Sequence, residues 1–294
     1  MRLLFLTIVL SLCATAAERT QAVLLLPFQA ETPEQVDLGI GVHNLLENML
    51  LRHGGLEETW VLNSYRTLFP KLEELRDFRF DKAEAKGIVE LPHRWVVTGR
   101  MRQSAILLEV TDRVSKQSVS AEIPFDAPSW GKTRQDYRAL LAKAGVPWTD
   151  EQSLAMEWRE DLTFAAMQQM GAGLRNYVEV MIYQPEGRTY ERADLEKALG
   201  SGSGSYLAAN NLGWVYFQQG EAKRAEDSFG NALKWNGAGI DALDGILESA
   251  IKRADIAGFR EALGKKARAR QQLNPSSAML SKAAERWENS GDKA

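Results

Sequence analysis

Cysteine is almost absent from this sequence, in which Cys13 is the only one among 294 residues. A single cysteine excludes a disulfide framework within the chain, and it excludes metal sites built from several thiolates. Histidine is nearly as scarce, with His43, His53 and His93. None of the three has another histidine or a cysteine at metal-ligand spacing, so we expect no metal centre. His43 falls on the apolar face of a predicted helix, which favours core packing.

A marked charge excess is also lacking, since the formal net charge is −3. Nucleic-acid-binding proteins usually carry a strong basic excess, so we do not expect nucleic acid as a partner. One long apolar run, LLFLTIVLSL, follows Arg2. With the small residues Ala14 and Ala16 after it, this run predicts a signal peptide over residues 1–17. No other run approaches membrane-spanning length, which predicts no membrane span after the signal is removed.

The predicted signal peptide indicates a secreted protein, which is periplasmic if the source is Gram-negative. Cys13 raises the alternative of a lipid anchor. A lipid attachment site has a small residue directly before its cysteine, however, and Leu12 occupies that place. We therefore favour ordinary cleavage, after which the mature chain contains no thiol.

Motifs of catalysis and cofactor binding are missing too. The pair Gly39 and Gly41 has no third glycine at dinucleotide-binding spacing, and the run GSGSGS at 200–205 lacks the Lys-Ser/Thr of a phosphate loop. The chain contains no G-x-S-x-G element. Only carboxylates outside any catalytic motif would support a hydrolase, and such carboxylates usually lie on the solvated surface. We therefore expect a protein that is not an enzyme, with no catalytic residues and no cofactor.

Residues 20–126 alternate between strand and helix patterns. The apolar run at 21–28 predicts a buried strand, and helical spacing of apolar residues follows Pro33 until Gly54. Residues 59–62 predict a short strand, and residues 82–90 a helix. Three alternating segments at 93–103, 105–111 and 118–125 then predict an antiparallel meander. Together these patterns predict an α/β domain: strand, helix, strand, helix and then antiparallel strands.

Three apolar phrases occur in this region in a particular order. They are the strand Val23–Phe28, then Gly55-Leu56 before Trp60-Val61, and finally Ala85–Met101. In content and order they resemble the small domain of TolB-N-terminal-like and FlgO-like envelope proteins, which is often fused to tetratricopeptide repeats. The resemblance implies a role in envelope assembly or sensing, and it supplies no catalytic residues.

The second half of the chain reads as helix throughout. Residues 127–160 predict a connecting helical segment with one helix at 133–144, which we expect to hold the two halves together, and residues 161–291 predict helical hairpins. The GSGSGS run has the composition of a flexible linker. Its position between two predicted hairpins favours a turn between repeats, with a free linker as the alternative. A final helix at 276–289 predicts the terminal cap that repeat arrays need.

The most specific pattern lies between Tyr206 and Gly237. Large and small residues alternate there on the facing sides of two helices, at Ala209, Leu212, Gly213, Tyr216, Ala225, Phe229 and Ala232. This pattern resembles a tetratricopeptide repeat, with alanine at 209 and glycine at 237 as departures from its usual tryptophan and proline. The resemblance implies an all-α array of helical hairpins that serves as a binding scaffold.

A second stripe on the first of these helices consists of Asn210, Trp214, Phe217 and Gln218, at i, i+4, i+7 and i+8. In tetratricopeptide proteins the corresponding stripe lines the groove that holds a peptide. The next repeat has Asp241, Asp244 and Glu248 on the equivalent stripe. These carboxylates would make the groove acidic and favour a basic or polar ligand. The alternative, equally open, is that Trp214 and Phe217 pack on the preceding hairpin or on the N-terminal domain.

The sequence thus predicts a non-catalytic, secreted adaptor of the cell envelope that binds a protein or peptide partner. Its predicted binding residues are Asn210, Trp214, Phe217, Gln218, Asp244 and Glu248. The alternative function is a small-molecule sensor, in which the α/β domain binds the ligand and the repeats form an output arm.

Overall fold

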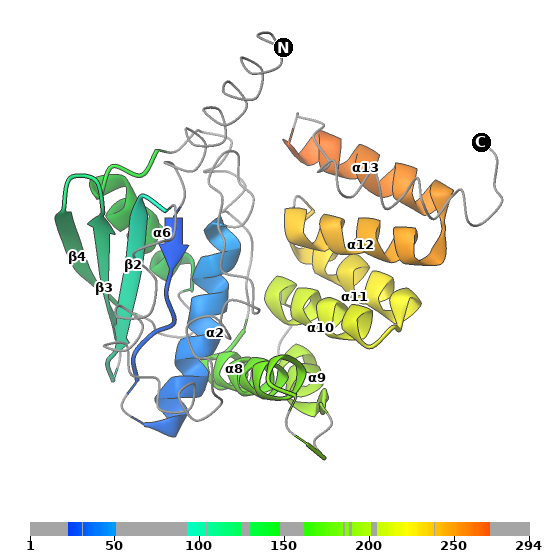
Figure 1. The fold of residues 1–294 in the computed structure, drawn as a ribbon, viewed down its shortest axis with the longest axis horizontal. Helices are drawn as coiled ribbons and strands as arrows, with labels where there is room; N and C mark the ends of the chain where they lie inside the picture. The colour runs from blue at the N-terminus through cyan, green and yellow to red at the C-terminus, as the bar shows by residue number, and fades with distance from the viewer. Residues whose placement is uncertain are drawn as a thin grey trace, which may run out of the picture.

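The computed structural model describes residues 23–30, 32–50, 93–103, 105–124, 130–147, 162–184, 186–187, 190–200, 205–237 and 239–270. The predicted signal peptide, the strand at 59–62 and the helices at 82–90 and 276–289 lie outside the described residues. Figure 1 shows a sheet at one side of the molecule and a stack of helices at the other, with helix α2 between them.

The sheet has four described strands, in the order β1-β2-β3-β4. They are β1 Val23–Leu25, β2 Trp95–Met101, β3 Ala105–Asp112 and β4 Gln117–Pro124. The three later strands pair antiparallel, for example through Val97 and Val110, so the predicted meander is confirmed. β1 lies parallel to β2, with Leu24 opposite Val96. Parallel pairing requires a crossover between the two strands, and α2 follows β1 in the chain.

Alternation along the strands directs one face of the sheet into a hydrophobic core. β2 and β3 bury Trp95, Val97 and Ile106 there, together with residues of α2 (Pro33–Leu50) and of α6 (Trp130–Lys143). The helix predicted at 133–144 begins three residues earlier, at Trp130, whose indole Nε1 donates to the carbonyl of Leu162. That hydrogen bond joins α6 to the start of the helical array.

The C-terminal part of the described chain is an array of helices, as the sequence predicted. The described helices are α8 Phe164–Tyr177, α9 Ala193–Gly200, α10 Tyr206–Gln218, α11 Ala222–Trp235, α12 Ile240–Arg253 and α13 Ile256–Arg270. α8 continues into a π-helical turn, η2 Val178–Ile182. Ser205, the last residue of the GSGSGS run, caps α10, because its Oγ accepts a hydrogen bond 2.9 Å long from the Ala208 amide.

The two halves of the molecule meet directly at α2 and α8. A Cβ atom added at Gly171 would lie 1.7 Å from the backbone oxygen of Asp37, and one added at Gly41 would lie 2.4 Å from the backbone oxygen of Met167. The two backbones therefore touch, which side chains at these positions would prevent. Beside the contact, Arg175 Nε donates to Asp37 Oδ1 at 2.6 Å. Apolar residues of both halves form a single core cluster.

Within the array, Phe229 of α11 is the central packing residue. Its ring lies between Gly213 of α10 and Gly245 of α12, where an added Cβ would approach it to 2.5 and 2.3 Å respectively. The other small residues of the pattern, Ala225 and Ala232, are fully buried. The alternation of large and small residues therefore sets how closely α10, α11 and α12 approach one another.

Candidate functional site

Helix α10 is the most buried helix of the array, and it carries no charged residue. A helix that is apolar all round is normally buried, and here α9, α11 and α12 pack around it. It also reaches the first half of the molecule, since Asn211 Nδ2 donates to Asn44 Oδ1 of α2 at 2.8 Å. Near its C-terminus, Trp214 and Phe217 are only half-buried and Gln218 is exposed. These residues are where α10 reaches the surface.

Asn210 and Trp214 bind the same carboxylate at the start of α12. The Asn210 Nδ2 and Trp214 Nε1 atoms donate to Asp241 Oδ2 at 2.6 and 2.9 Å. Asp241 is half-buried, whereas Asn210 is 1% exposed. These hydrogen bonds fix the indole ring in one orientation and join consecutive hairpins of the array.

Aromatic contacts and a lysine hold the other end of the stripe. The Trp214 ring meets the rings of Phe229 and Phe217 edge to face, at centroid distances of 5.1 and 5.8 Å. The Lys252 Nζ atom lies 4.6 Å from the centroid of the Phe217 ring and donates to the Phe217 carbonyl at 2.9 Å. A cation is favoured at this position because the last carbonyls of α10 carry partial negative charge.

The six predicted binding residues are thus not all brought together. Asn210, Trp214 and Phe217 lie along the junction of α10 with α12, and Gln218 is exposed beside them. Asp244 is 1% exposed, and its carboxylate accepts a hydrogen bond from Lys266 of α13. Glu248 is half-buried on α12. The predicted acidic stripe therefore divides, with Asp241 directed to α10 and Asp244 to α13.

For Trp214, the sequence left open a groove position or packing on a preceding element. Its indole hydrogen bond to Asp241 and its ring contact with Phe229 both reach helices that follow α10 in the chain. The sequence prediction also omitted Lys252. This residue lies one turn beyond Glu248 at i+4, so the helical spacing of α12 could have indicated it.

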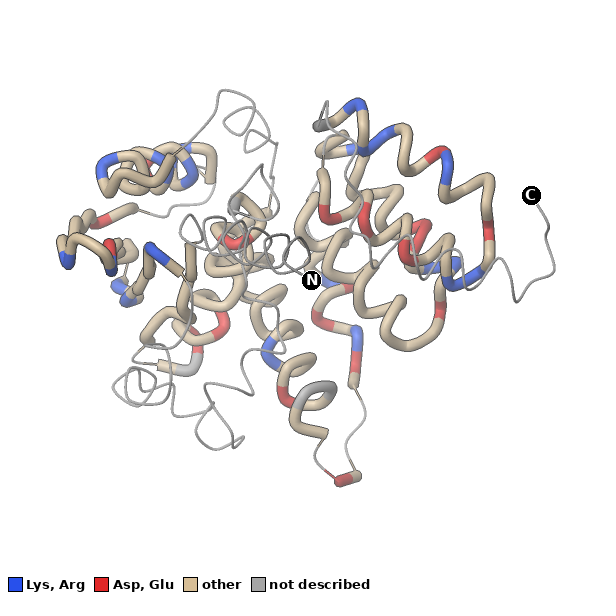
Figure 2. Tube along the Cα trace, turned by 45° about the horizontal axis from the view of Figure 1, so that its top comes forward, with Lys and Arg blue, Asp and Glu red and all other residues tan. Residues whose placement is uncertain are grey.

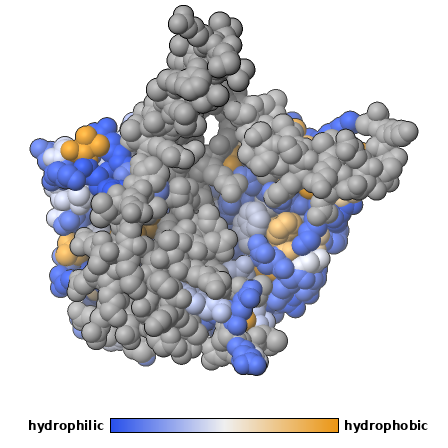
Figure 3. All heavy atoms as spheres, in the orientation of Figure 1, coloured by the Kyte–Doolittle hydropathy of each residue, from blue (hydrophilic) through white to orange (hydrophobic). Residues whose placement is uncertain are grey.

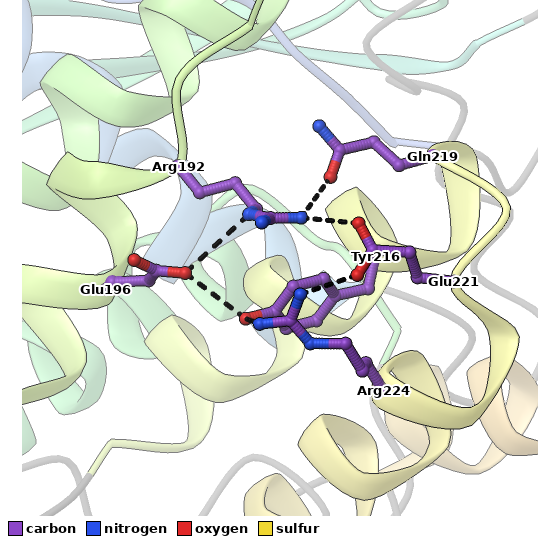
Figure 4. A network of polar contacts seen from close by, with 6 residues as sticks. All are labelled: Arg192, Glu196, Tyr216, Gln219, Glu221 and Arg224. Atoms are coloured by element: carbon purple, nitrogen blue, oxygen red, sulfur yellow. Dashed lines mark hydrogen bonds and ion pairs between the residues drawn. The ribbon is translucent and has the colours of Figure 1, made fainter.

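A polar network fastens α9 to the turn between α10 and α11 (Figure 4). Arg192 donates to Gln219 Oε1 at 2.7 Å and to Glu221 Oε1 at 2.6 Å, and it lies 3.6 Å from Glu196. Tyr216 donates its hydroxyl proton to Glu196. The charges of Arg192 and Arg224 balance those of Glu196 and Glu221, which favours a structural role for this network.

Tyr216 is the centre of this network. The guanidinium carbons of Arg192 and Arg224 lie 4.9 and 4.3 Å from the centroid of its ring. Burial raises the pKa of the Tyr216 hydroxyl, while the arginines hold the pKa of Glu221 below its usual value through hydrogen bonds. The Glu221 carboxylate therefore stays ionised at neutral pH, so its ion pairs with Arg192 and Arg224 hold the helices together there.

The first half of the molecule contains two buried histidines, His43 and His93. His43 is 3% exposed, and its Nε2 atom lies 3.3 Å from the carbonyl oxygen of Leu25. Burial lowers the pKa of His43 to about 4, although Glu47 lies 4.0 Å from its Nδ1 atom. Burial, with the charge of Arg113, lowers the pKa of His93 to about 4 as well. Core packing of His43, as its helical position predicted, accounts for its neutral state.

The described surface offers few exposed apolar groups. Val114, in the turn between β3 and β4, is the one large hydrophobic residue of the described chain that is exposed, at 70%. The face in Figure 3 is mainly hydrophilic where it is coloured, with small separate apolar areas. Figure 2 shows basic and acidic positions interspersed along much of the array, with basic ones frequent on α13.

Neither a metal centre nor a membrane span emerges from this geometry. Within the described residues, no three His, Cys, Asp or Glu side chains are grouped so that they could hold a metal ion. None of the helices described combines the length and the apolar character that crossing a membrane requires. No family model matches the chain, and no curated protein is significantly similar to it.

Proposed function

We propose that this protein is a non-catalytic adaptor whose helical array, of tetratricopeptide type, binds an extended segment of a partner protein. The binding surface consists of Trp214, Phe217 and Gln218 of α10 together with Asp241 and Glu248 of α12; we call it the α10–α12 face. The α/β part then positions the array. The predicted signal peptide and the envelope-domain resemblance favour a periplasmic or secreted location and a partner in the cell envelope.

One observation carries this proposal. Helix α10 has no charged residue and is otherwise buried, yet it keeps two aromatic side chains half-exposed near its C-terminus. Aromatic residues held rigidly at a surface are enriched at the energetic centres of protein interfaces. Completing the burial of Trp214 in a complex would contribute up to about 2–3 kcal/mol.

The size of the face favours a peptide segment over a globular partner. Large, stable interfaces have extended apolar cores, whereas here the aromatic pair is flanked by polar residues such as Gln218 and Asp241. Both aromatic rings are already oriented by Phe229, Asp241 and Lys252. A preordered surface loses little conformational entropy on binding, so a short segment can bind it usefully.

Site-specific crosslinking tests the proposal in cells that produce the full chain. A photo-crosslinking residue replaces the exposed Gln218 in one strain and the exposed Asn231 of α11 in a control strain. We expect a discrete adduct with a partner from position 218 and none from position 231. Adding Trp214→Ala and Phe217→Ala should abolish that adduct.

The aromatic substitutions also remove packing against Phe229, so folding must be checked separately. Thermal unfolding and circular dichroism of the purified variant show whether the array is intact. A folded double variant that still forms the same adduct would contradict the α10–α12 face as the binding surface. Equal adducts from positions 218 and 231 would contradict it as well.

A further inference from the structure

Among the described residues, Asp241 is a carboxylate without a cationic partner. Both of its hydrogen-bond donors, Asn210 Nδ2 and Trp214 Nε1, are neutral groups, and both bind its Oδ2 atom. Over the ranges that the structure describes, no lysine or arginine forms an ion pair with it. By contrast, Asp244 binds Lys266 and Asp37 binds Arg175. Buried charges are normally paired. Asp241 differs from Asp244 and Asp37 because no described cation balances its charge.

A second acceptor lies beside it. Asn210 is 1% exposed, and no donor of the described protein reaches its Oδ1 atom. A buried amide oxygen without a donor is uncommon and costs free energy. The group of Asn210, Trp214 and Asp241 therefore has more acceptors than donors and a net negative charge. The ligand that complements it is positively charged and carries several donors.

The aromatic ring of the group fits the same ligand. The Trp214 indole is half-buried, and its edge is held by the hydrogen bond to Asp241. Tryptophan has the aromatic face that attracts cations most strongly. A carboxylate next to such a face can bind an ammonium or guanidinium group by charge and by ring contact at once.

We infer that Asp241, Trp214 and Asn210 form a binding position for a lysine or arginine side chain of the partner segment. This inference rests on the proposed function, since it assigns a chemistry to one position of the α10–α12 face. Lys252 lies at the other end of that face, beside Phe217, and it repels a second cation there. The preferred segment thus has its basic side chain near the start of α12 and an apolar or acidic one near Phe217.

Selection from a random peptide library tests this position. The purified full chain serves as bait, alongside the variants Asp241→Asn and Asp227→Asn. Asp227 is an exposed carboxylate of α11 that pairs with Lys223, so it is a matched control for loss of one charge. We expect lysine and arginine to be enriched in peptides selected by the wild type and by Asp227→Asn, and not in those selected by Asp241→Asn.

A synthetic peptide from that selection gives the quantitative test. Replacing its basic residue by norleucine, which removes the charge and keeps the chain, should weaken binding to the wild type about tenfold, a typical loss for a partly desolvated charge pair. The same replacement should make no difference with Asp241→Asn. Raised salt should weaken only the charged peptide. The comparison of the charged and norleucine peptides on the wild type remains valid even if Asp241→Asn folds poorly.

The outcomes distinguish a failure of the cation position from a failure of the peptide-binding face. If selected peptides lose binding on Phe217→Ala but show no preference for basic residues, the cation position is wrong and the α10–α12 face stands. If norleucine and lysine peptides bind equally well, the cation position is also wrong. If no peptide is selected by any bait, both the cation position and the peptide-binding face are contradicted.

Discussion

Two junctions in this molecule use glycine for opposite purposes. Between α2 and α8, Gly41 and Gly171 let two helix backbones touch, with a built Cβ only 1.7 Å from a backbone oxygen at Gly171. Between α10 and α12, Gly213 and Gly245 instead make room for the Phe229 ring. At the first junction the closest atoms to an added Cβ belong to the backbone, and at the second they belong to one side chain.

The first junction joins the two halves of the molecule, and the second lies within the array. α2, a helix of the α/β half, covers α8, which is the first described helix of the array. A backbone contact is rigid, because nothing in it can change rotamer, whereas a side-chain contact can adjust when its neighbours change.

The largest effect is expected from removing the central side chain of the second junction. Phe229→Ala leaves a cavity between Gly213 and Gly245 and should lower the free energy of unfolding by about 3–5 kcal/mol. Urea denaturation of the full chain measures this loss. A loss below that of a typical exposed substitution would show that Phe229 does not hold α10, α11 and α12 together.

Gly171→Ala tests the backbone junction. The added methyl must push α8 away from the Asp37 carbonyl, so we expect a loss of about 3 kcal/mol in the free energy of unfolding. Gly230→Ala is the matched control, because Gly230 also lies within a helix and has nothing within 4 Å of an added Cβ. The control should be stabilised by about 0.5–1 kcal/mol. Equal effects at both glycines would refute the close contact.

Lowering the pH from about 6.5 to about 4 should destabilise the half that contains α2, because the array has no histidine. The pKa of His43 is about 4 in the folded protein, below its unfolded value of about 6.5. The unfolded state therefore binds more protons, and stability is lost as pH falls from about 6.5 to about 4, by about 2–3 kcal/mol for this group. His43→Gln should flatten the curve of unfolding free energy against pH over that range, leaving the slope that His93 contributes.

A double-mutant cycle sharpens the contrast between the junctions. Gly245→Ala should cost less in a Phe229→Leu background, because the trimmed side chain no longer meets the new methyl; we expect a coupling of about 1 kcal/mol. Gly171→Ala, which meets a backbone atom, should show no coupling to Phe229→Leu. Additivity at Gly245, measured by urea denaturation, would mean that the ring does not fill the space beside it.

The smallest effect is expected at the charged network around Tyr216. Glu221→Gln removes the ion pairs with Arg192 and Arg224, yet these side chains are partly exposed and solvent screens them. Thermal unfolding should detect a smaller change than any of those above, and one that shrinks further in high salt. A change as large as that of Phe229→Ala would indicate that the network, and not Phe229, joins the hairpins.

Much of the secondary structure could be predicted from the sequence. Alternation in the segments at 93–103, 105–111 and 118–125 predicted β2, β3 and β4, and helical spacing predicted α2 and the helices of the array. Gly220, which follows the end of α10, is a local signal of the same kind. Periodicity is also local, so these features needed no knowledge of the distant chain.

The candidate site was less predictable. Helical spacing placed Asn210, Trp214 and Phe217 on one stripe, and they do line one junction. It also grouped Asp241 with Asp244 and Glu248, although the structure directs Asp241 to α10 and Asp244 to Lys266 on α13. Which side of a helix a neighbour occupies depends on hairpins that lie many residues away. Spacing along one helix carries no information on that choice.

Strands and helices could be assigned to segments from residue periodicity alone, because local geometry and the burial of apolar residues impose their periods. The sequence also indicated that Phe229 faces small residues. Three features became visible only in the fold: α2 covers α8, Gly41 and Gly171 allow the two backbones to touch, and Asp241 has no cation among its described neighbours. Those features depend on contacts between segments far apart in the chain, where neither spacing nor composition specifies the partner.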